Sequence, residues 1–223
     1  MFAHIAIEFF VAGGPIMWPI LGTFMVAIAV VGERILWWAR LGRNRDPLRL
    51  QDVLAAAEQG DFRRASSLAQ GSEDPVVHTI WHGLNHVNSS LQGALQVAAG
   101  VELQKAGRFQ STLDTLVTLA PLLGLLGTVT GIMGAFTAIG GDELAIGKVT
   151  GGIGEALIAT ACGLGIAILC LIPFNLFNAK VAKLQFDLET AATNIDVMVS
   201  AAKQKKINGG SVSVSETTTL LRQ

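Results

Sequence analysis

The acid–base and hydroxyl chemistry of this sequence lies inside two long apolar runs. Glu155 is the only carboxylate in the run 151–178, and Thr160 follows it by five residues. Thr128 lies in the charge-free stretch 118–136 of the preceding run. A charged side chain at membrane depth costs about 2.5–3.5 kcal/mol, and such residues usually face a bundle interior or a water-filled cavity. A hydroxyl-lined path past a titratable carboxylate is what proton movement through a bilayer needs.

The angular spacing of these groups restricts how they can act together. At 3.6 residues per turn, Glu155 and Thr160 point about 140° apart, so they cannot share one narrow helix face. One of them is expected to face a central cavity and the other a neighbouring helix. Each threonine can also satisfy its hydroxyl on the carbonyl one turn earlier in its own helix, which leaves a purely local role open.

Composition indicates a membrane protein. Of 223 residues, 51% are hydrophobic and only 15% are charged, whereas a soluble domain carries about 25% charged residues. Segments 15–38, 113–139 and 151–178 are apolar and long enough to cross a bilayer, which takes about 20 residues. The first lacks the basic n-region of a cleaved signal peptide, so we expect a retained helix. The prediction is an all-α membrane protein with three transmembrane helices.

The distribution of Lys and Arg predicts the orientation. These residues are absent from 1–14 and concentrated in 39–112 and beyond 179, and the connection 140–150 has only Lys148. The positive-inside rule therefore predicts a periplasmic N-terminus (1–14), a short periplasmic loop (140–150), and a cytoplasmic middle region and C-terminus. A net charge of −1 gives no indication of nucleic-acid binding.

The segments outside the membrane have helical patterns. In the cytoplasmic region 39–112, Asp46-Pro47 begins a helix and Gly60-Asp61 ends it. A long helix is expected from about residue 76 into the second membrane segment, with weak points at Gly93 and Gly100. The third helix is expected to continue over 179–207 and to pack an apolar stripe on 76–112 as part of a cytoplasmic helical bundle. The tail 208–223 is expected to be disordered. The stripe consists of Val181, Leu184, Leu188, Ala191, Ile195 and Met198.

Small residues recur along both membrane helices. In lipid, no hydrophobic effect drives helices together, so association depends on close backbone approach at small residues. The second helix offers Gly124, Gly127, Gly131, Gly134 and Ala135, and the third offers Gly151, Gly154, Ala159, Gly163 and Ala167. This pattern predicts tight packing of the two helices.

Other candidate sites are weaker. His78, His82 and His86 share one helix face at i, i+4 and i+8, which could form a metal site, but no fourth ligand supports it. Cys162 and Cys170 are eight residues apart and are expected to be packing residues. A nucleophile motif, a P-loop and a dinucleotide fingerprint are absent from the sequence, so an enzyme and a bound cofactor are not expected.

Two motifs resemble a known family. APLLGLLGTVTGIM (120–133) and GIGEALIATACG (152–163) closely resemble the two signature helices of the MotA/TolQ/ExbB proton channel family. GPIMWPI (14–20) and GERIL (32–36) are similar to the first helix of ExbB-type members. Three membrane helices with a modest cytoplasmic region resemble ExbB and TolQ more than MotA.

The resemblance implies a homopentamer in the bacterial inner membrane. Its second and third helices would line a central pore that holds a dimer of a single-span partner resembling ExbD, TolR or MotB. Proton flow would drive work through that partner, with protons as the coupling ion and no cofactor. The family's pore threonines and glutamate fall on Thr128, Thr160 and Glu155, and its second-helix proline falls on Pro121.

The sequence also departs from the family pattern. Thr130 stands where tryptophan is frequent and adds an accessory hydroxyl to the pore. The usual third-helix proline position is Leu169, and Pro173 follows one turn later, so a kink would move by about 5.4 Å. Two alternatives stay open: a scaffold that clasps a partner without conducting ions, and a stand-alone ion channel. The partner, its process, and the choice between proton and sodium are not determined by the sequence.

Overall fold

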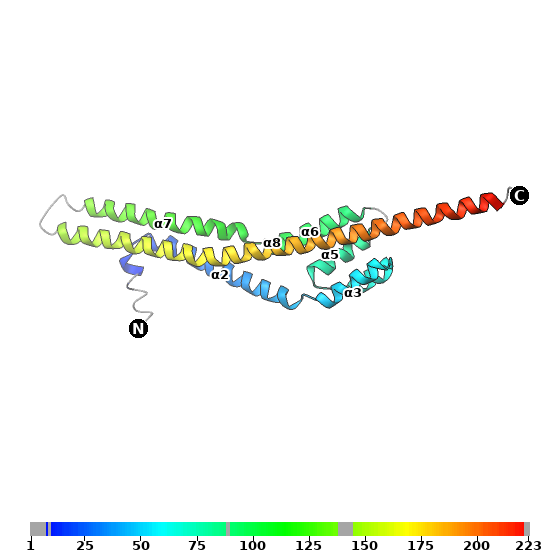
Figure 1. Cartoon of the computed structure of the whole chain (residues 1–223). Coiled ribbons are helices and arrows are strands. Elements are labelled where there is room, and N and C mark those ends of the chain that lie inside the picture. Colours follow the sequence, from blue (N-terminus) through cyan, green and yellow to red (C-terminus); the bar gives the residue numbers. More distant parts are fainter. Residues whose placement is uncertain (1–7, 9, 88–89, 138–144, 221–223) are drawn as a thin grey trace. The chain divides into compact units, whose positions relative to one another are not determined.

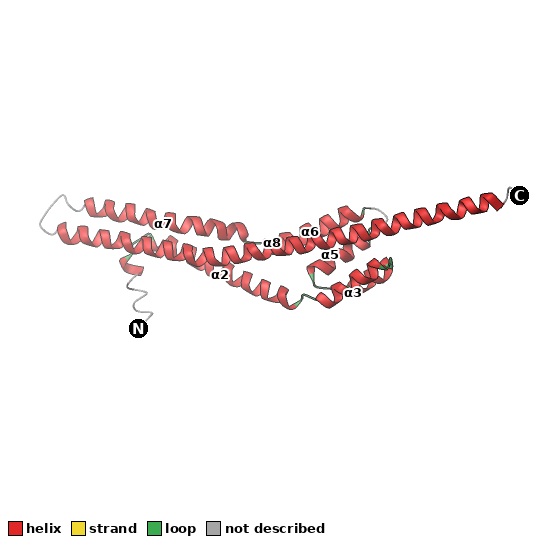
Figure 2. Ribbon diagram, in the orientation of Figure 1, coloured by secondary structure: helices red, strands yellow, loops and turns green. Residues whose placement is uncertain are grey.

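The computed structural model describes residue 8 and residues 10–87, 90–137 and 145–220 (Figure 1). The regular elements within these residues are α-helices (Figure 2). They fall into two compact units. The first unit comprises Met1–Trp38 and Arg108–Ala179, and the second comprises Ala39–Gly107 and Lys180–Gln223.

Three helices of the described chain are long and apolar enough to cross a membrane. They are α2 (Met17–Arg43), α7 (Gln110–Thr137) and the apolar part of α8 (Ala145–Leu220). The bounds of α2 and α7 lie within five residues of the expected segments 15–38 and 113–139, and the expected segment 151–178 lies inside α8. Helix α8 begins within the connection expected at 140–150, and residues 138–144 lie outside the described residues.

Short helices follow α2 in the second unit. They are α3 (Pro47–Glu58), α4 (Phe62–Ala69), α5 (Pro75–Leu84) and α6 (Leu91–Ala106). Each begins at a side chain that accepts a hydrogen bond from a backbone N–H of the first turn. These capping residues are Asp46, Asp61, Asp74 and Ser90. The expected start at Asp46-Pro47 and the break at Gly60-Asp61 are therefore both present.

The continuous helix expected from residue 76 into the membrane is wrong. Its sequence forms α5, α6 and α7, and the expected weak points Gly93 and Gly100 both lie inside α6. A helix-interior glycine costs only about 1 kcal/mol, which tertiary packing can offset. The break before α7 instead falls at Gly107–Phe109, where Phe109 has a left-handed backbone (φ 62°).

Helix α8 extends through the tail that was expected to be disordered, as far as Leu220. The chain has no proline after Pro173. Each further residue can therefore add one backbone hydrogen bond to an existing helix, which is far easier than starting a new one.

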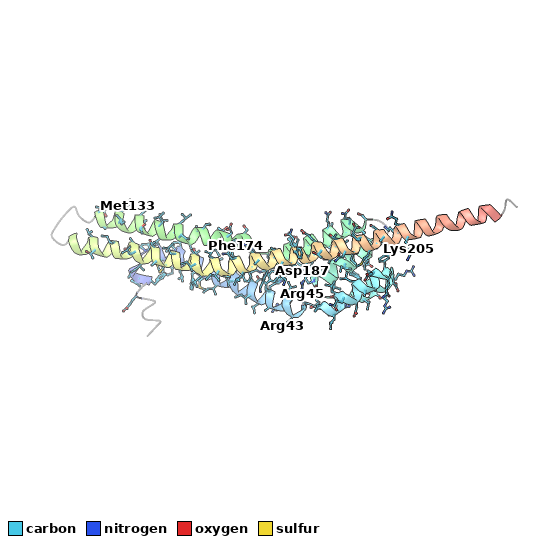
Figure 3. The ribbon with its side chains drawn as sticks, viewed as in Figure 1. Arg43, Arg45, Met133, Phe174, Asp187 and Lys205 are labelled. Atoms are coloured by element: carbon cyan, nitrogen blue, oxygen red, sulfur yellow. The ribbon has the colours of Figure 1, made fainter. Side chains whose placement is uncertain are left out.

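An apolar stripe on α8 adds to the core of the second unit, most of which comes from α3 to α6. Leu184, Leu188, Ala191 and Ile195 are buried as expected, but Val199 rather than Met198 continues the buried row. Residues of α6 and of this stripe line a common pocket, including Leu95 and Leu188. Arg45 and Asp187 form an ion pair, and their side chains lie together in Figure 3.

Candidate functional site

Helices α7 and α8 pack antiparallel with their backbones in close contact. A Cβ atom on Gly163 would lie 2.5 Å from the carbonyl oxygen of Ala120, and one on Gly131 would lie 2.8 Å from that of Gly152. A Cβ atom on Gly124 would lie 3.0 Å from Cα of Thr160. Any larger side chain at these positions would push the helices apart, which is the close approach that small residues allow in lipid.

The seam between α7 and α8 differs in part from the expected glycine stripe. Gly124, Gly127, Gly131 and Gly163 lie in it, and α8 contributes Gly152, Ala156 and Ala159. By contrast, Gly134, Gly151 and Gly154 face open space, because no described atom lies within 4 Å of the point that a Cβ atom would occupy. The prediction of Gly151 in the stripe is therefore wrong: its neighbour Gly152 contacts α7, because packing sets the rotation of α8 in the seam.

Thr160 is part of this seam. Its hydroxyl lies 2.9 Å from the carbonyl oxygen of Gly124 on α7 and 3.1 Å from that of Ala156 one turn earlier. The local hydrogen bond and a contact to the neighbouring helix, which the sequence offered as alternatives, are therefore both present. Thr160 joins the two helices.

The two threonines of α7 bond within their own helix. The hydroxyl of Thr128 donates to the carbonyl of Leu125 at 2.6 Å. The hydroxyl of Thr130 lies 3.0 Å from the carbonyl of Leu126 and 3.1 Å from that of Gly127. Thr128 is half-buried and Thr130 is exposed.

Glu155 opens onto a cavity of ≈ 610 Å³ within the first unit. Thr130 and Gly134 of α7, Gly152 of α8, and Pro15 before α2 also line it. Among the described residues, the Glu155 carboxylate has no hydrogen-bond or ion-pair partner. A molecule of liquid water occupies about 30 Å³, so the cavity has room for several water molecules beside the acid.

The structure thus groups the predicted polar residues differently from the sequence. Glu155 shares a cavity with Thr130, which was expected only as an accessory hydroxyl, while Thr160 faces α7 and Thr128 is not among the lining residues. The different surroundings of Glu155 and Thr160 agree with their angular separation of about 140°. The contribution of Pro15 was missed, although the Gly-Gly-Pro run at 13–15 is a turn signal that could have indicated it.

Both membrane prolines lie inside helices. Pro121 is within α7 and Pro173 is within α8. Each lacks the N–H that would bond the carbonyl four residues earlier, so Val117 and Leu169 each have a carbonyl without its usual helical donor. These positions are natural bending points.

The histidine face does not form a metal cluster in the residues described. No group of three or more His, Cys, Asp or Glu side chains there could hold an ion. His78 instead stacks on Trp81 and lies 3.4 Å from the carboxylate of Glu102 on α6. His86 lies 2.9 Å from the carbonyl of His82. The contacts of these histidines are therefore within α5, with the residues that follow it, and with Glu102 of α6.

Comparison with known proteins identifies the family. Residues 69–190 match the model of the MotA/TolQ/ExbB proton channel family. The chain is 33% identical over 174 residues to biopolymer transport protein ExbB-like 3 of Synechocystis, covering 75% of this chain and 82% of that protein. It is 28% identical over 193 residues to biopolymer transport protein ExbB of Pseudomonas putida, covering 78% of this chain and 58% of that protein.

The chain belongs to the MotA/TolQ/ExbB proton channel family. It is therefore a multi-pass membrane protein of a channel family and not an enzyme. The resemblance inferred from the two signature helices is confirmed. The matched range of this ExbB-like chain includes Thr128, Glu155 and Thr160, whereas Pro15 and the rest of the N-terminal segment lie outside it.

Proposed function

We propose that this ExbB-like chain is the proton-conducting subunit of a motor that couples the proton motive force to mechanical work. The observation that carries the proposal is the placement of Glu155. It is the only acid of the apolar run 151–178, lacks a partner among the described residues, and borders a cavity that Thr130 also lines. An acid with room for water beside it can take up and release a proton.

Each polar residue has a separate role in this proposal. Glu155 is the proton carrier, and Thr130, whose hydroxyl bonds carbonyls of its own helix, lines the same cavity. Thr160 holds α7 and α8 in register, so that the carboxylate remains on the cavity. Thr128 lies two residues before Thr130, the first cavity-lining residue of α7, and is assigned to the continuation of the pathway in the assembled protein.

The proposed assembly is a homopentamer around a central pore lined by α7 and α8. The pore holds a dimer of a single-span protein resembling ExbD, TolR or MotB, through which work is delivered. Family membership supports this arrangement, as does the apolar surface left uncovered on both helices. That surface includes Leu122, Leu125, Met133, Phe136, Leu157, Leu164 and Ile168.

The energy available suits repeated small rearrangements. Moving one charge through 100 mV yields about 2.3 kcal/mol. Five subunits around two partner helices cannot all make the same contacts, so neighbouring arrangements differ little in free energy. A few protons per cycle are then enough to move the assembly from one arrangement to the next.

We propose the bacterial inner membrane as the location, with the N-terminus in the periplasm and the C-terminus in the cytoplasm. The excess of Lys and Arg in 39–112 and beyond 179 supports this orientation. Residues 39–112 and 179–207 then form the cytoplasmic helical region. Names of relatives support biopolymer transport as the process.

Replacement of Glu155 tests the proposal. The chain and its copurifying single-span partner are reconstituted in liposomes, and proton flux is driven by a potassium diffusion potential. We expect Glu155→Gln to abolish flux, because the amide keeps the volume of the side chain but cannot carry a proton. Thr160→Ala is expected to reduce flux in part by loosening the seam.

Two controls separate the alternatives. If Glu155→Gln leaves flux and partner-dependent work at wild-type levels, the chain is a scaffold and the proposal is wrong. If the chain without its partner conducts as well as the complex, it is a stand-alone channel. Partner copurification measured for each variant shows that loss of flux does not come from loss of assembly.

A further inference from the structure

The segment that precedes α2 ends in a left-handed turn. Gly14 has φ +70°, its N–H donates to the carbonyl of Val11 at 3.4 Å, and its own carbonyl accepts from the N–H of Met17 at 3.1 Å. Residues other than glycine adopt this backbone at a cost, because their Cβ atom approaches the following carbonyl oxygen. The turn directs Pro15 and Ile16 into the lining of the Glu155 cavity.

The Glu155 carboxylate lies where a side chain on Gly14 would be. A Cβ atom built on Gly14 would lie 1.6 Å from Oε1 of Glu155, 2.4 Å from its Cδ and 3.0 Å from its Cγ. The first two distances are far shorter than any van der Waals contact. The carboxylate therefore rests against the bare Cα of Gly14, so glycine at this position suits both the left-handed backbone and the observed place of the acid.

We propose that Gly14 is a positioning residue for Glu155. The turn closes one side of the cavity. The Glu155 carboxylate occupies the space beside Gly14 because this residue has a hydrogen where other residues have Cβ. This inference rests on the proposed role of Glu155 in proton transfer. It assigns to the N-terminal segment, which lies outside the range matched by the family model, a direct part in setting where the proton is held.

A side chain at Gly14 would move the acid more readily than the fold. The atoms in the way belong to the end of a flexible glutamate rather than to backbone. At neighbouring Gly13, a Cβ atom would instead meet Cγ of Met17 at 2.5 Å and Cγ2 of Ile158 at 3.1 Å, so the Glu155 carboxylate is not involved. The two glycines therefore offer matched substitutions with different targets.

The first test compares Gly14→Ala with two controls in the full complex. Displacement of a reacting group by about 1 Å can cost about a hundredfold in rate, and we expect a loss of proton flux of that order. Gly71→Ala places alanine at a similar left-handed backbone (φ +73°) with open space around it, and Gly13→Ala tests the adjacent position. Both controls are expected to retain flux within about threefold of wild type.

The second test measures the chemical reactivity of the Glu155 carboxyl group directly. Dicyclohexylcarbodiimide reacts with protonated carboxyl groups, and mass spectrometry follows its rate at Glu155 with Asp114 as an internal reference. We expect Gly14→Ala to change the Glu155 rate by about tenfold, and Gly71→Ala and Gly13→Ala to leave it unchanged. An unchanged Glu155 rate in Gly14→Ala would overturn the proposal.

The third test is a double-mutant cycle with Glu155→Asp. The shorter acid has its carboxyl carbon where Glu155 has Cγ, 3.0 Å from the new Cβ, and its oxygens near the place of Cδ rather than of Oε1, so its overlap with the new side chain is smaller. Gly14→Ala should therefore cost much less flux in the Asp background than in the wild type. Equal costs in both backgrounds would show that Gly14 acts on the backbone alone.

If the Gly14→Ala protein accumulates poorly in cells, its level in the Glu155→Asp background still tests the proposal. Restored accumulation in the Glu155→Asp background supports the contact, and failure to restore it while Gly71→Ala accumulates normally contradicts it. The labelling experiment also distinguishes this proposal from the proposed function. If Glu155→Gln retains coupled flux, the proton role of Glu155 fails, but the labelling rate still shows whether Gly14 positions its carboxylate.

Discussion

Thr160 joins two membrane helices with one hydroxyl group. Its single O–H is shared between the carbonyl of Gly124 on α7 at 2.9 Å and the carbonyl of Ala156 one turn earlier on α8 at 3.1 Å. This geometry is available because Gly124 has no side chain to hold the helices apart, as a Cβ there would lie 3.0 Å from Cα of Thr160. The threonine and the facing glycine therefore act as a pair.

Replacement of Thr160 by its isostere tests this hydrogen bond. Thr160→Val keeps the shape but removes the donor, so we expect a loss of about 0.6–1.7 kcal/mol in the free energy of unfolding. Thr160→Ser keeps the donor and is expected to lie near the wild type. Unfolding in mixed micelles with increasing sodium dodecyl sulfate measures both. Equal stability of the valine variant would mean that the hydroxyl contributes nothing to the seam.

At the scale of elements, the α7–α8 seam limits where side chains can be added. Gly163 faces backbone, since a Cβ atom built on it would lie 2.5 Å from the carbonyl oxygen of Ala120 and 3.1 Å from Cα of Gly124. Two residues later on the same helix, Gly165 faces open space. Backbone atoms cannot move aside as a flexible side chain can, so the two positions should respond in opposite ways.

Alanine at these two glycines provides a matched pair. We expect Gly163→Ala to destabilise the protein by about 1–3 kcal/mol through overpacking. Gly165→Ala is expected to be neutral or to stabilise it by up to about 1 kcal/mol, because alanine favours the helical backbone. Thermal unfolding in detergent with both variants side by side measures the difference. Destabilisation of similar size at both positions would show that loss of glycine flexibility, rather than the seam, is responsible.

At the scale of the whole molecule, the membrane helices leave much of their apolar surface uncovered. In the most apolar stretch of the second and of the third membrane segment, about 28% of the residues are buried within the chain. Large exposed side chains such as Leu122 and Phe136 on α7 and Leu157 on α8 require lipid or protein around them. Family membership favours copies of the chain and a partner for part of this surface.

The assembly can be measured on the complex extracted from membranes. We expect native mass spectrometry to give five copies of the 23.4 kDa chain, with the additional mass of two copies of a single-span protein. Dissociation in the gas phase should release the single-span chains intact. A stable complex with a different number of copies, or one that never retains a second protein, would contradict the proposed arrangement.

The sequence by itself determined the class of protein and its membrane helices. Runs of about 20 apolar residues can satisfy their backbone groups in lipid only as helices, so hydropathy alone places α2 and α7 to within about five residues and places the third apolar run inside α8. The helix start at Asp46 and the break at Gly60-Asp61 likewise depend on local signals and were predicted from the sequence. The two signature motifs indicated the family because their glycine, threonine and glutamate types occur at fixed spacing.

Only the tertiary structure decided which groups lie together. Helical periodicity gives the direction of a side chain around its own helix, but the rotation and register of a neighbour depend on packing across the whole seam. That packing placed Thr160 against Gly124, selected Gly152 over Gly151, and brought Thr130 rather than Thr128 to the Glu155 cavity. The contact between Gly14 and Glu155 joins residues 141 positions apart, and sequence spacing carries no information about such a pair.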